Sequence, residues 1–254
     1  MNRPRAGFSL VELSIVLVIL GLLVGGILAG QSLIRAAEMR NVGTEYNRYI
    51  TAVSAFRDKY FAIPGDFHSA TSIWPQSTVC GGATAGGVCN GDGDGTINTG
   101  SIEPFQFWTQ LADAGLVEGS YSGTSGPGGV NESVIGTNCP GSKLSTAGWT
   151  PETKGSYTGV SVRYTGSYGN DFSFGAFKTG SATDYPSILL PEEAWNIDTK
   201  LDDGYPGTGK IFVRSYGSWG ASSCSTSTSD TDYTGVYNVS YKQRQCSLYF
   251  LRAF

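Results

Sequence analysis

Charged residues and histidine are scarce in this 254-residue chain. Only 15% of the residues are charged, and the formal net charge is −4. A nucleic-acid surface needs clustered Lys and Arg, so the composition predicts no nucleic-acid partner. The single histidine, His68, has no hydrolase signature around it, and no zinc-protease, Walker or dinucleotide-binding motif occurs. We therefore interpret His68 as a surface or turn residue and the chain as non-catalytic.

Closely spaced cysteine pairs are absent as well, because none of the five cysteines forms a CxxC motif. This disfavours a zinc knuckle or a redox motif. In an exported chain the cysteines are better interpreted as disulfide partners. Sequence does not fix the pairing. We favour Cys80 with Cys89 and Cys224 with Cys246, each closing a Gly- or Ser-rich loop, with Cys139 left over. The alternative is that all five are reduced.

A long apolar run is present near the N-terminus, from residue 8 to residue 28. It contains one charge, Glu12, and as a helix it is about 31 Å long, enough to cross a membrane. Residues 1–7 precede it and carry two arginines, which predicts a cytoplasmic leader. A secretory signal would have a shorter apolar region followed by its cleavage site. Here the plausible cut lies before the run, between Gly7 and Phe8, and leaves the helix on the product.

Glu12 is unusual, because a carboxylate inside a membrane helix costs about 2.5–3.5 kcal/mol and such residues are functional by default. The stretch GFSLVEL, residues 7–13, resembles the prepilin signal of type IV pilins and type II secretion pseudopilins. The resemblance implies that a prepilin peptidase cleaves after Gly7 and methylates Phe8. It also implies that Glu12 pairs with the N-terminal ammonium of a neighbouring subunit during assembly. A simple signal anchor with a chance glutamate is the alternative.

The helix is predicted to continue beyond the membrane, because residues 31–63 keep apolar positions at helical spacing until Pro64-Gly65. We therefore divide the chain into a leader (1–7), a transmembrane and filament-core helix (8–30), a helix continuing into the head (31–63) and a periplasmic head (64–254). Four glycines between residues 21 and 30 weaken the middle of this helix. Local melting there on assembly is a hypothesis that rests on these glycines alone.

The rest of the chain is rich in Gly, Ser and Thr and predicts an α+β fold. We expect the long helix to pack on an antiparallel sheet with short inserted helices and long loops, as the resemblance to pilins also implies. Residues 120–151 are expected to be loop. The expected helices are Glu103–Gly115, and Pro191–Asp203 with Trp195 and Leu201 facing inward; the expected strands are Tyr157–Tyr164, Phe172–Phe177, Lys210–Tyr216 and Cys246–Phe254.

Parts of the head also resemble a group of bacterial proteins with prepilin-type N-termini, loosely termed type II secretion system proteins. The stretches that carry this resemblance are FRDKYFAIPGDF (56–67), NGDGDGTI (90–97) and AWNIDTKLDDG (194–204). The roles of these proteins are poorly defined, so the resemblance narrows the family more than the function.

The stretch from Asn90 to Ile97 resembles the first part of an EF-hand-type calcium loop. Asn90, Asp92 and Asp94 would supply side-chain oxygens, and Thr96 its carbonyl. The pattern departs from the full motif, because Ser101 stands at the twelfth position and Glu103 comes two residues late. The resemblance to major pseudopilins, which have calcium sites in the head, favours Ca²⁺. A flexible Gly/Asp turn is the alternative.

A second acidic group consists of Asp198, Asp202 and Asp203. Asp198 and Asp202 are expected to share a helix face, where like charges repel. A cation, Lys200 or solvent would relieve this repulsion, and solvent is the expectation.

These features predict a structural filament subunit of the bacterial inner membrane, with a cytoplasmic N-terminus and a periplasmic head. Its expected partners are prepilin peptidase, homologous pilin or pseudopilin subunits bound through the N-terminal helix, and an inner-membrane assembly platform. Two alternatives stay open. One is a minor tip pilin whose head binds a surface, DNA or cargo, and the other is a membrane-tethered Ca²⁺-binding head that does not polymerise.

Overall fold

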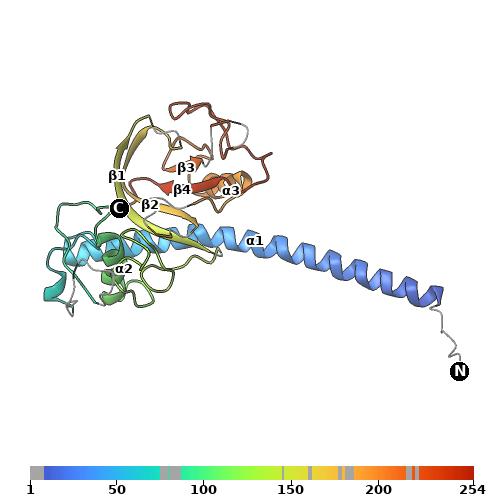
Figure 1. The fold of residues 1–254 in the computed structure, drawn as a ribbon, viewed down its shortest axis with the longest axis horizontal. Helices are drawn as coiled ribbons and strands as arrows, with labels where there is room; N and C mark the ends of the chain where they lie inside the picture. The colour runs from blue at the N-terminus through green and yellow to red at the C-terminus, as the bar shows by residue number, and fades with distance from the viewer. Residues whose placement is uncertain are drawn as a thin grey trace, which may run out of the picture.

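One helix, α1, runs from Leu10 to Tyr60 and connects the two parts of the chain in the computed structural model (Figure 1). Its first half projects freely, and its second half lies against the head (Figure 1). The helix ends before the Pro64-Gly65 pair predicted to stop it, because Phe61 takes a left-handed conformation with φ 55°. The structure describes residues 9–74, 80, 87–144, 146–159, 162–176, 179–180, 186–215, 219–220 and 223–254.

The second half of α1 is amphipathic and forms one side of the hydrophobic core. The α1 residues buried against the head are Val42, Glu45, Tyr49, Ala52, Val53 and Phe56. Their spacing follows the helical period, so they form a single stripe. The helix is unbroken between Gly21 and Gly30. The hypothesis of local melting concerns the assembled filament and stays a prediction.

The head is built on a four-stranded antiparallel sheet in the order β1-β2-β4-β3. The strands are β1 (Ala147–Tyr157), β2 (Gly166–Ala176), β3 (Ile211–Ser215) and β4 (Cys246–Phe250). One face packs on α1 through aromatic rings: Tyr46 stacks on Phe250 at 4.5 Å, and Tyr49 lies 5.9 Å from Trp149. Because side chains alternate along a strand, the neighbouring positions face away from α1. The expected α+β fold, with its long helix on an antiparallel sheet, is confirmed.

The expected strand at Tyr157–Tyr164 is wrong, and so is the expectation of loop up to residue 151. The strand β1 occupies residues 147–157 instead and contains Pro151. Proline is tolerated there because β1 is an edge strand, where a missing N–H breaks no ladder. The other three expected strands overlap β2, β3 and β4.

Two short helices, α2 (Glu103–Asp113) and α3 (Pro191–Leu201), lie within their predicted ranges. A third, 3-10 helix, η1, covers Ala70–Ser72. The inward residue predicted for α3 is wrong, because Trp195 is 42% exposed, whereas Ala194 and Ile197 are buried. Leu201, the other inward candidate, is half-buried and packs against the core.

Two disulfides tie parts of the head together. They join Cys80 to Cys89 and Cys224 to Cys246, the pairs favoured from the sequence. Cys139 is buried and belongs to neither disulfide. The second bridge attaches β4 to the C-terminal loops, and the first closes a loop next to the predicted calcium stretch.

Candidate functional site

The first candidate site is the free half of α1, whose side chains are exposed from Leu10 to Ala29. Large apolar side chains dominate it, and Leu10, Leu22 and Leu28 are 87%, 73% and 61% exposed. Soluble surfaces rarely carry an apolar patch of this extent, so it marks a membrane or protein contact. By length and composition alone, the helix is able to cross a membrane.

Glu12 lies in the first turn of this helix and closes a capping box with Ser9. The backbone N–H of Ser9 donates to Glu12 Oε2 at 2.9 Å, and the Glu12 N–H donates to Ser9 Oγ at 3.3 Å. These bonds satisfy two amides that have no partner within the helix, and the carboxylate is further stabilised by the helix dipole. Gly7 and Phe8, the residues predicted to flank the cut, lie outside the described residues.

A family model described as the prokaryotic N-terminal methylation motif matches residues 2–28. The chain carries a prepilin-type N-terminal motif. This motif is that of type IV pilins and pseudopilins, and it points to a structural subunit and away from an enzyme. It implies processing by prepilin peptidase and assembly with other pilin subunits. Together with the free apolar helix, the motif fits membrane anchoring. Comparisons with curated proteins and with solved structures found no match.

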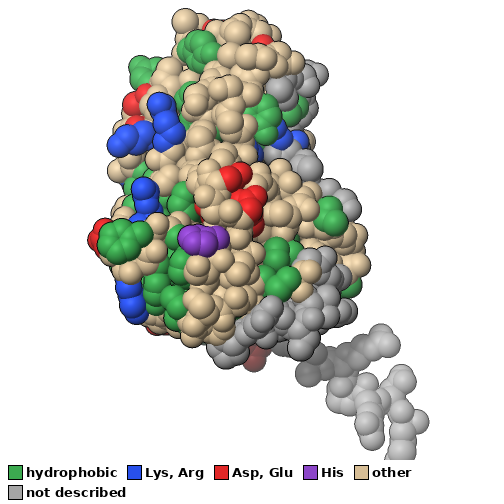
Figure 2. Space-filling model, turned by 90° about the vertical axis from the view of Figure 1, so that its left-hand side faces the viewer, with side chains coloured by type: hydrophobic (Ala, Val, Ile, Leu, Met, Phe, Trp, Pro, Cys, Tyr) green, Lys and Arg blue, Asp and Glu red, His purple; other side chains and the backbone are tan. Residues whose placement is uncertain are grey.

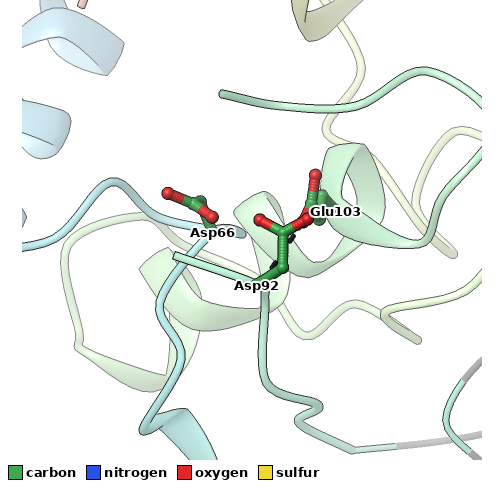
Figure 3. A group of neighbouring side chains, drawn as sticks. All are labelled: Asp66, Asp92 and Glu103. Carbon is green, nitrogen blue, oxygen red and sulfur yellow. Dashed lines mark hydrogen bonds between the residues drawn. The ribbon is translucent and has the colours of Figure 1, made fainter. Parts of the chain in front are cut away.

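The second candidate site is a group of three carboxylates in the head, Asp66, Asp92 and Glu103 (Figure 3). One oxygen from each lies within 4.8 Å of the others. The three come from different segments: Asp66 from the turn after α1, Asp92 from the predicted calcium stretch and Glu103 from the first turn of α2 (Figure 3). Asp66 and Glu103 are buried, and Asp92 is exposed.

A glycine and a glutamine bring these segments together. A Cβ at Gly91 would lie 2.4 Å from the backbone of Asp66, so only glycine permits this approach. Gln110 of α2 accepts from the Gly65 N–H at 2.6 Å and donates to the Cys89 carbonyl at 3.1 Å. Helix α2 thereby fixes the turn that carries Asp66 beside the stretch that carries Asp92.

The structure keeps two of the five predicted ligands in this group and adds one that the sequence analysis missed. Asp92 and Glu103 are in the group, and Asp66 joins them. Asn90 instead accepts from the Thr71 N–H at 2.9 Å, and Asp94 accepts from both the N–H and the hydroxyl of Thr96. The calcium loop stays a prediction, and the described carboxylates gather around Asp66 and not along alternate loop positions.

Asp66 is surrounded by backbone amides. Its Oδ1 accepts from the N–H of Gly93 at 2.6 Å and from that of Asp94 at 3.2 Å, and its Oδ2 accepts from that of Gly95 at 2.9 Å. Burial raises the pKa of the Asp66 carboxyl, and these amides offset part of the rise. Burial likewise raises the pKa of Glu103, whose Oε2 accepts from the Asn98 N–H at 2.7 Å.

Three clustered carboxylates supply the oxygen ligands that a hard cation such as Ca²⁺ prefers. A cation would also relieve the carboxylate repulsion that adds to the effect of burial on both pKa values, since Asp92 acts on Glu103 and Asp94 acts on Asp66. A carboxylate oxygen has two lone pairs, so Asp66 Oδ2, which accepts one amide, keeps a second position for a metal, whereas Oδ1 already accepts two. The donor set thus fits Ca²⁺ in part, with Asp66, Asp92 and Glu103 as the protein ligands.

His68 is exposed in a turn, as the sequence analysis expected (Figure 2). It lines a surface cleft of about 590 Å³ together with Asp66 and Phe61. Acidic side chains gather on the same face of the molecule (Figure 2). The described contacts of His68 include no hydrogen-bonded nucleophile. They therefore give no support for a hydrolytic site.

The second acidic group is solvated only in part: Asp203 is exposed, Asp202 is partly buried and Asp198 is buried. Asp198 is fully buried, where the Tyr237 hydroxyl donates to its Oδ2 at 2.6 Å. Asp202 lies beyond the end of α3, not on a shared helix face, and its Oδ2 accepts from the Ile211 N–H at 3.0 Å. Asp203 accepts from the Tyr205 N–H at 2.8 Å. Hydrogen bonds to the surrounding chain, and not solvent alone, therefore relieve the repulsion.

Proposed function

We propose that this chain is a structural pilin or pseudopilin subunit that prepilin peptidase cuts between Gly7 and Phe8. It is anchored in the inner membrane with its head in the periplasm and then enters a helical filament. The observation that carries this proposal is the free apolar half of α1, which continues without a break into the half that packs on the head. A signal anchor alone has no need of a rigid connection between its membrane segment and a folded head.

Transfer from the membrane into a filament has a small hydrophobic cost, because lipid tails and a bundle of such helices are equally apolar. Specificity then has to come from polar groups. Glu12 is the one carboxylate in the apolar stretch, and cleavage before Phe8 creates an ammonium about one helical turn away. An unpaired charge is costly in this low-dielectric bundle, so Glu12 of one subunit should pair with the ammonium of a neighbour. This pairing would set the register between the two subunits.

Replacement of Glu12 tests this assignment. We expect Glu12→Ala and Glu12→Lys to insert into the membrane normally but to yield no filaments, because the register-setting charge is lost or reversed. Ser14→Ala, at an exposed position nearby on the same helix, is the matched control and should assemble. The readouts are membrane fractionation for insertion and sheared filaments for assembly. Normal filaments from the alanine variant would contradict the proposal, and copy number in purified filaments distinguishes a shaft subunit from a tip subunit.

Calcium binding by the head is a second proposal, supported by the loop pattern and by the proximity of Asp66, Asp92 and Glu103. Calorimetric titration of the full-length chain in detergent with CaCl₂ should show binding below millimolar concentration. Asp66→Asn should weaken it at least tenfold, whereas Glu118→Gln, an exposed change after α2, should leave it unchanged. Absence of heat from the unaltered chain below millimolar Ca²⁺ would refute this proposal and leave the filament assignment intact.

A further inference from the structure

A lysine is enclosed between two carboxylates on the face of the sheet that points away from α1. Lys154 Nζ lies 2.6 Å from Glu152 Oε2 and 3.3 Å from Asp171 Oδ2. The three side chains are 2%, 1% and 0% exposed, although the backbone of this edge strand is partly open. Neither the filament role nor the candidate calcium site uses them.

The strand register holds the three groups in place. Glu152 of β1 pairs directly with Asp171 of β2 (Figure 1 shows the two strands side by side). Lys154 follows two positions later, next to an irregularity in the register of β1. Its ammonium group therefore reaches back toward the Glu152–Asp171 pair and also donates to Ser173 Oγ at 2.7 Å. Two strands, not flexible loops, supply all the groups.

Aromatic rings and one further cation surround this triad. Lys154 Nζ lies 5.0 Å from the centre of the Tyr249 ring. The Arg163 guanidinium packs over the Tyr157 and Tyr249 rings, and its Nε donates to the Tyr249 hydroxyl at 3.0 Å. The Tyr249 ring thus covers the Lys154 ammonium, whose two carboxylate neighbours are buried with it. The ammonium and the two carboxylates are therefore held in direct contact and away from bulk water.

We propose that Lys154 and Asp171 form an intramolecular isopeptide bond, with Glu152 as the proton carrier. Glu152 accepts a proton from the Lys154 ammonium, and the free amine attacks Cγ of Asp171 to form the N–C bond. The bond from Cγ to one Asp171 oxygen breaks, and this oxygen leaves as water with two protons that come from the former ammonium by way of Glu152. An ammonium and a carboxylate become a neutral amide and one water, so atoms and charge balance and no oxidant or cofactor is needed.

Enclosure favours this reaction for two physical reasons. The fixed proximity of amine and carboxyl gives a high effective concentration, which a reaction between free side chains lacks. The product also removes two charges from a site where isolated charges are expensive. The result is a covalent bond between β1 and β2 beside the open edge of the sheet.

Mass spectrometry of the full-length chain tests the proposal without any substitution. The measured mass should be lower, by the mass of one water, than the mass calculated from the sequence after N-terminal processing and formation of the two disulfides. After trypsin digestion, cleavage after Arg163 should leave the peptide containing Lys154 joined to the peptide containing Asp171, with no cut after Lys154. A measured mass without the loss of one water would overturn the proposal, and so would a water loss without this joined pair of peptides.

Variants then assign the roles. Lys154→Arg keeps the charge but lacks the amine, and should show the full sequence mass and two separate peptides. Glu152→Gln keeps both reacting groups and should lose most of the cross-link. If Glu152 had only a structural role, this variant would still form the cross-link. Lys200→Arg, an exposed lysine on α3, is the matched control and should remain cross-linked. Full cross-linking in Glu152→Gln would overturn the role of Glu152.

Discussion

At the scale of single residues, Asp198 couples folding to pH. Burial raises the pKa of its carboxyl to about 7, although the Tyr237 hydroxyl donates to it. An Asp in the unfolded chain has a pKa of about 3.9, so between about pH 4 and pH 7 the folded state binds more protons than the unfolded state. Stability should therefore fall as pH rises through this window, by at most about 1.4 kcal/mol per pH unit.

Asp198→Asn should remove this pH dependence, because the amide stays neutral and still accepts from Tyr237. Urea unfolding of the chain in detergent, followed by tryptophan fluorescence between pH 4 and pH 8, measures the effect. Asp58→Asn is the control and should retain the slope of the unaltered chain. Equal slopes for Asp198→Asn and the unaltered chain would show that Asp198 is not the titrating group.

Local sequence pattern indicated some of the candidate residues and missed others for a physical reason. Glu12 was found because a charge within an apolar run is visible in a short window. Asp66 was missed because its partners, Asp92 and Glu103, are separated from it along the chain and meet only through tertiary packing. Asp198 was expected to be solvated because the sequence does not reveal that Tyr237 covers it.

At the scale of elements, a buried carboxylate adds to the aromatic contact between α1 and the sheet. Glu45 of α1 accepts from Trp149 Nε1 of β1 at 2.9 Å and from the Lys143 N–H at 2.7 Å. Glu45→Ala leaves both donors without this acceptor, which should lower the free energy of unfolding by about 2–4 kcal/mol. Urea unfolding measures the loss, and Thr51→Ala, an exposed change on α1, should cost little. Equal stability of the two variants would contradict this role.

The elements themselves differ in how well the sequence predicts them. Helices α2 and α3 carry a proline in the first turn, and this signal placed their starts correctly. The start of β1 was missed because Pro151 reads as a loop residue, and only the position of β1 at the sheet edge makes it acceptable. The prediction that Trp195 of α3 faces inward was wrong, because it assumed that an apolar side chain is buried. Large aromatic side chains are often partly exposed.

At the scale of the whole molecule, the two disulfides stabilise the head by restricting the unfolded chain. Cys224–Cys246 spans 22 residues and Cys80–Cys89 spans 9. The loop-entropy relation predicts that Cys224→Ala/Cys246→Ala lowers the free energy of unfolding by about 3 kcal/mol, and Cys80→Ala/Cys89→Ala by slightly less. Urea unfolding under oxidising conditions measures the free energy of unfolding of the two double variants. A larger loss from the shorter loop would show that lost packing, not chain entropy, dominates.

The unbroken helix α1 also makes the head and the membrane segment one mechanical body. At 1.5 Å per residue α1 is about 77 Å long, and the ion pair between Arg35 and Glu193 clamps the head to it about 10 Å beyond Leu28. As long as α1 stays unbroken, sliding the apolar segment outward by one helical turn lifts the head by the same 5.4 Å. Under the proposed function, the height of the head above the membrane would therefore report how far the apolar segment has been withdrawn from it.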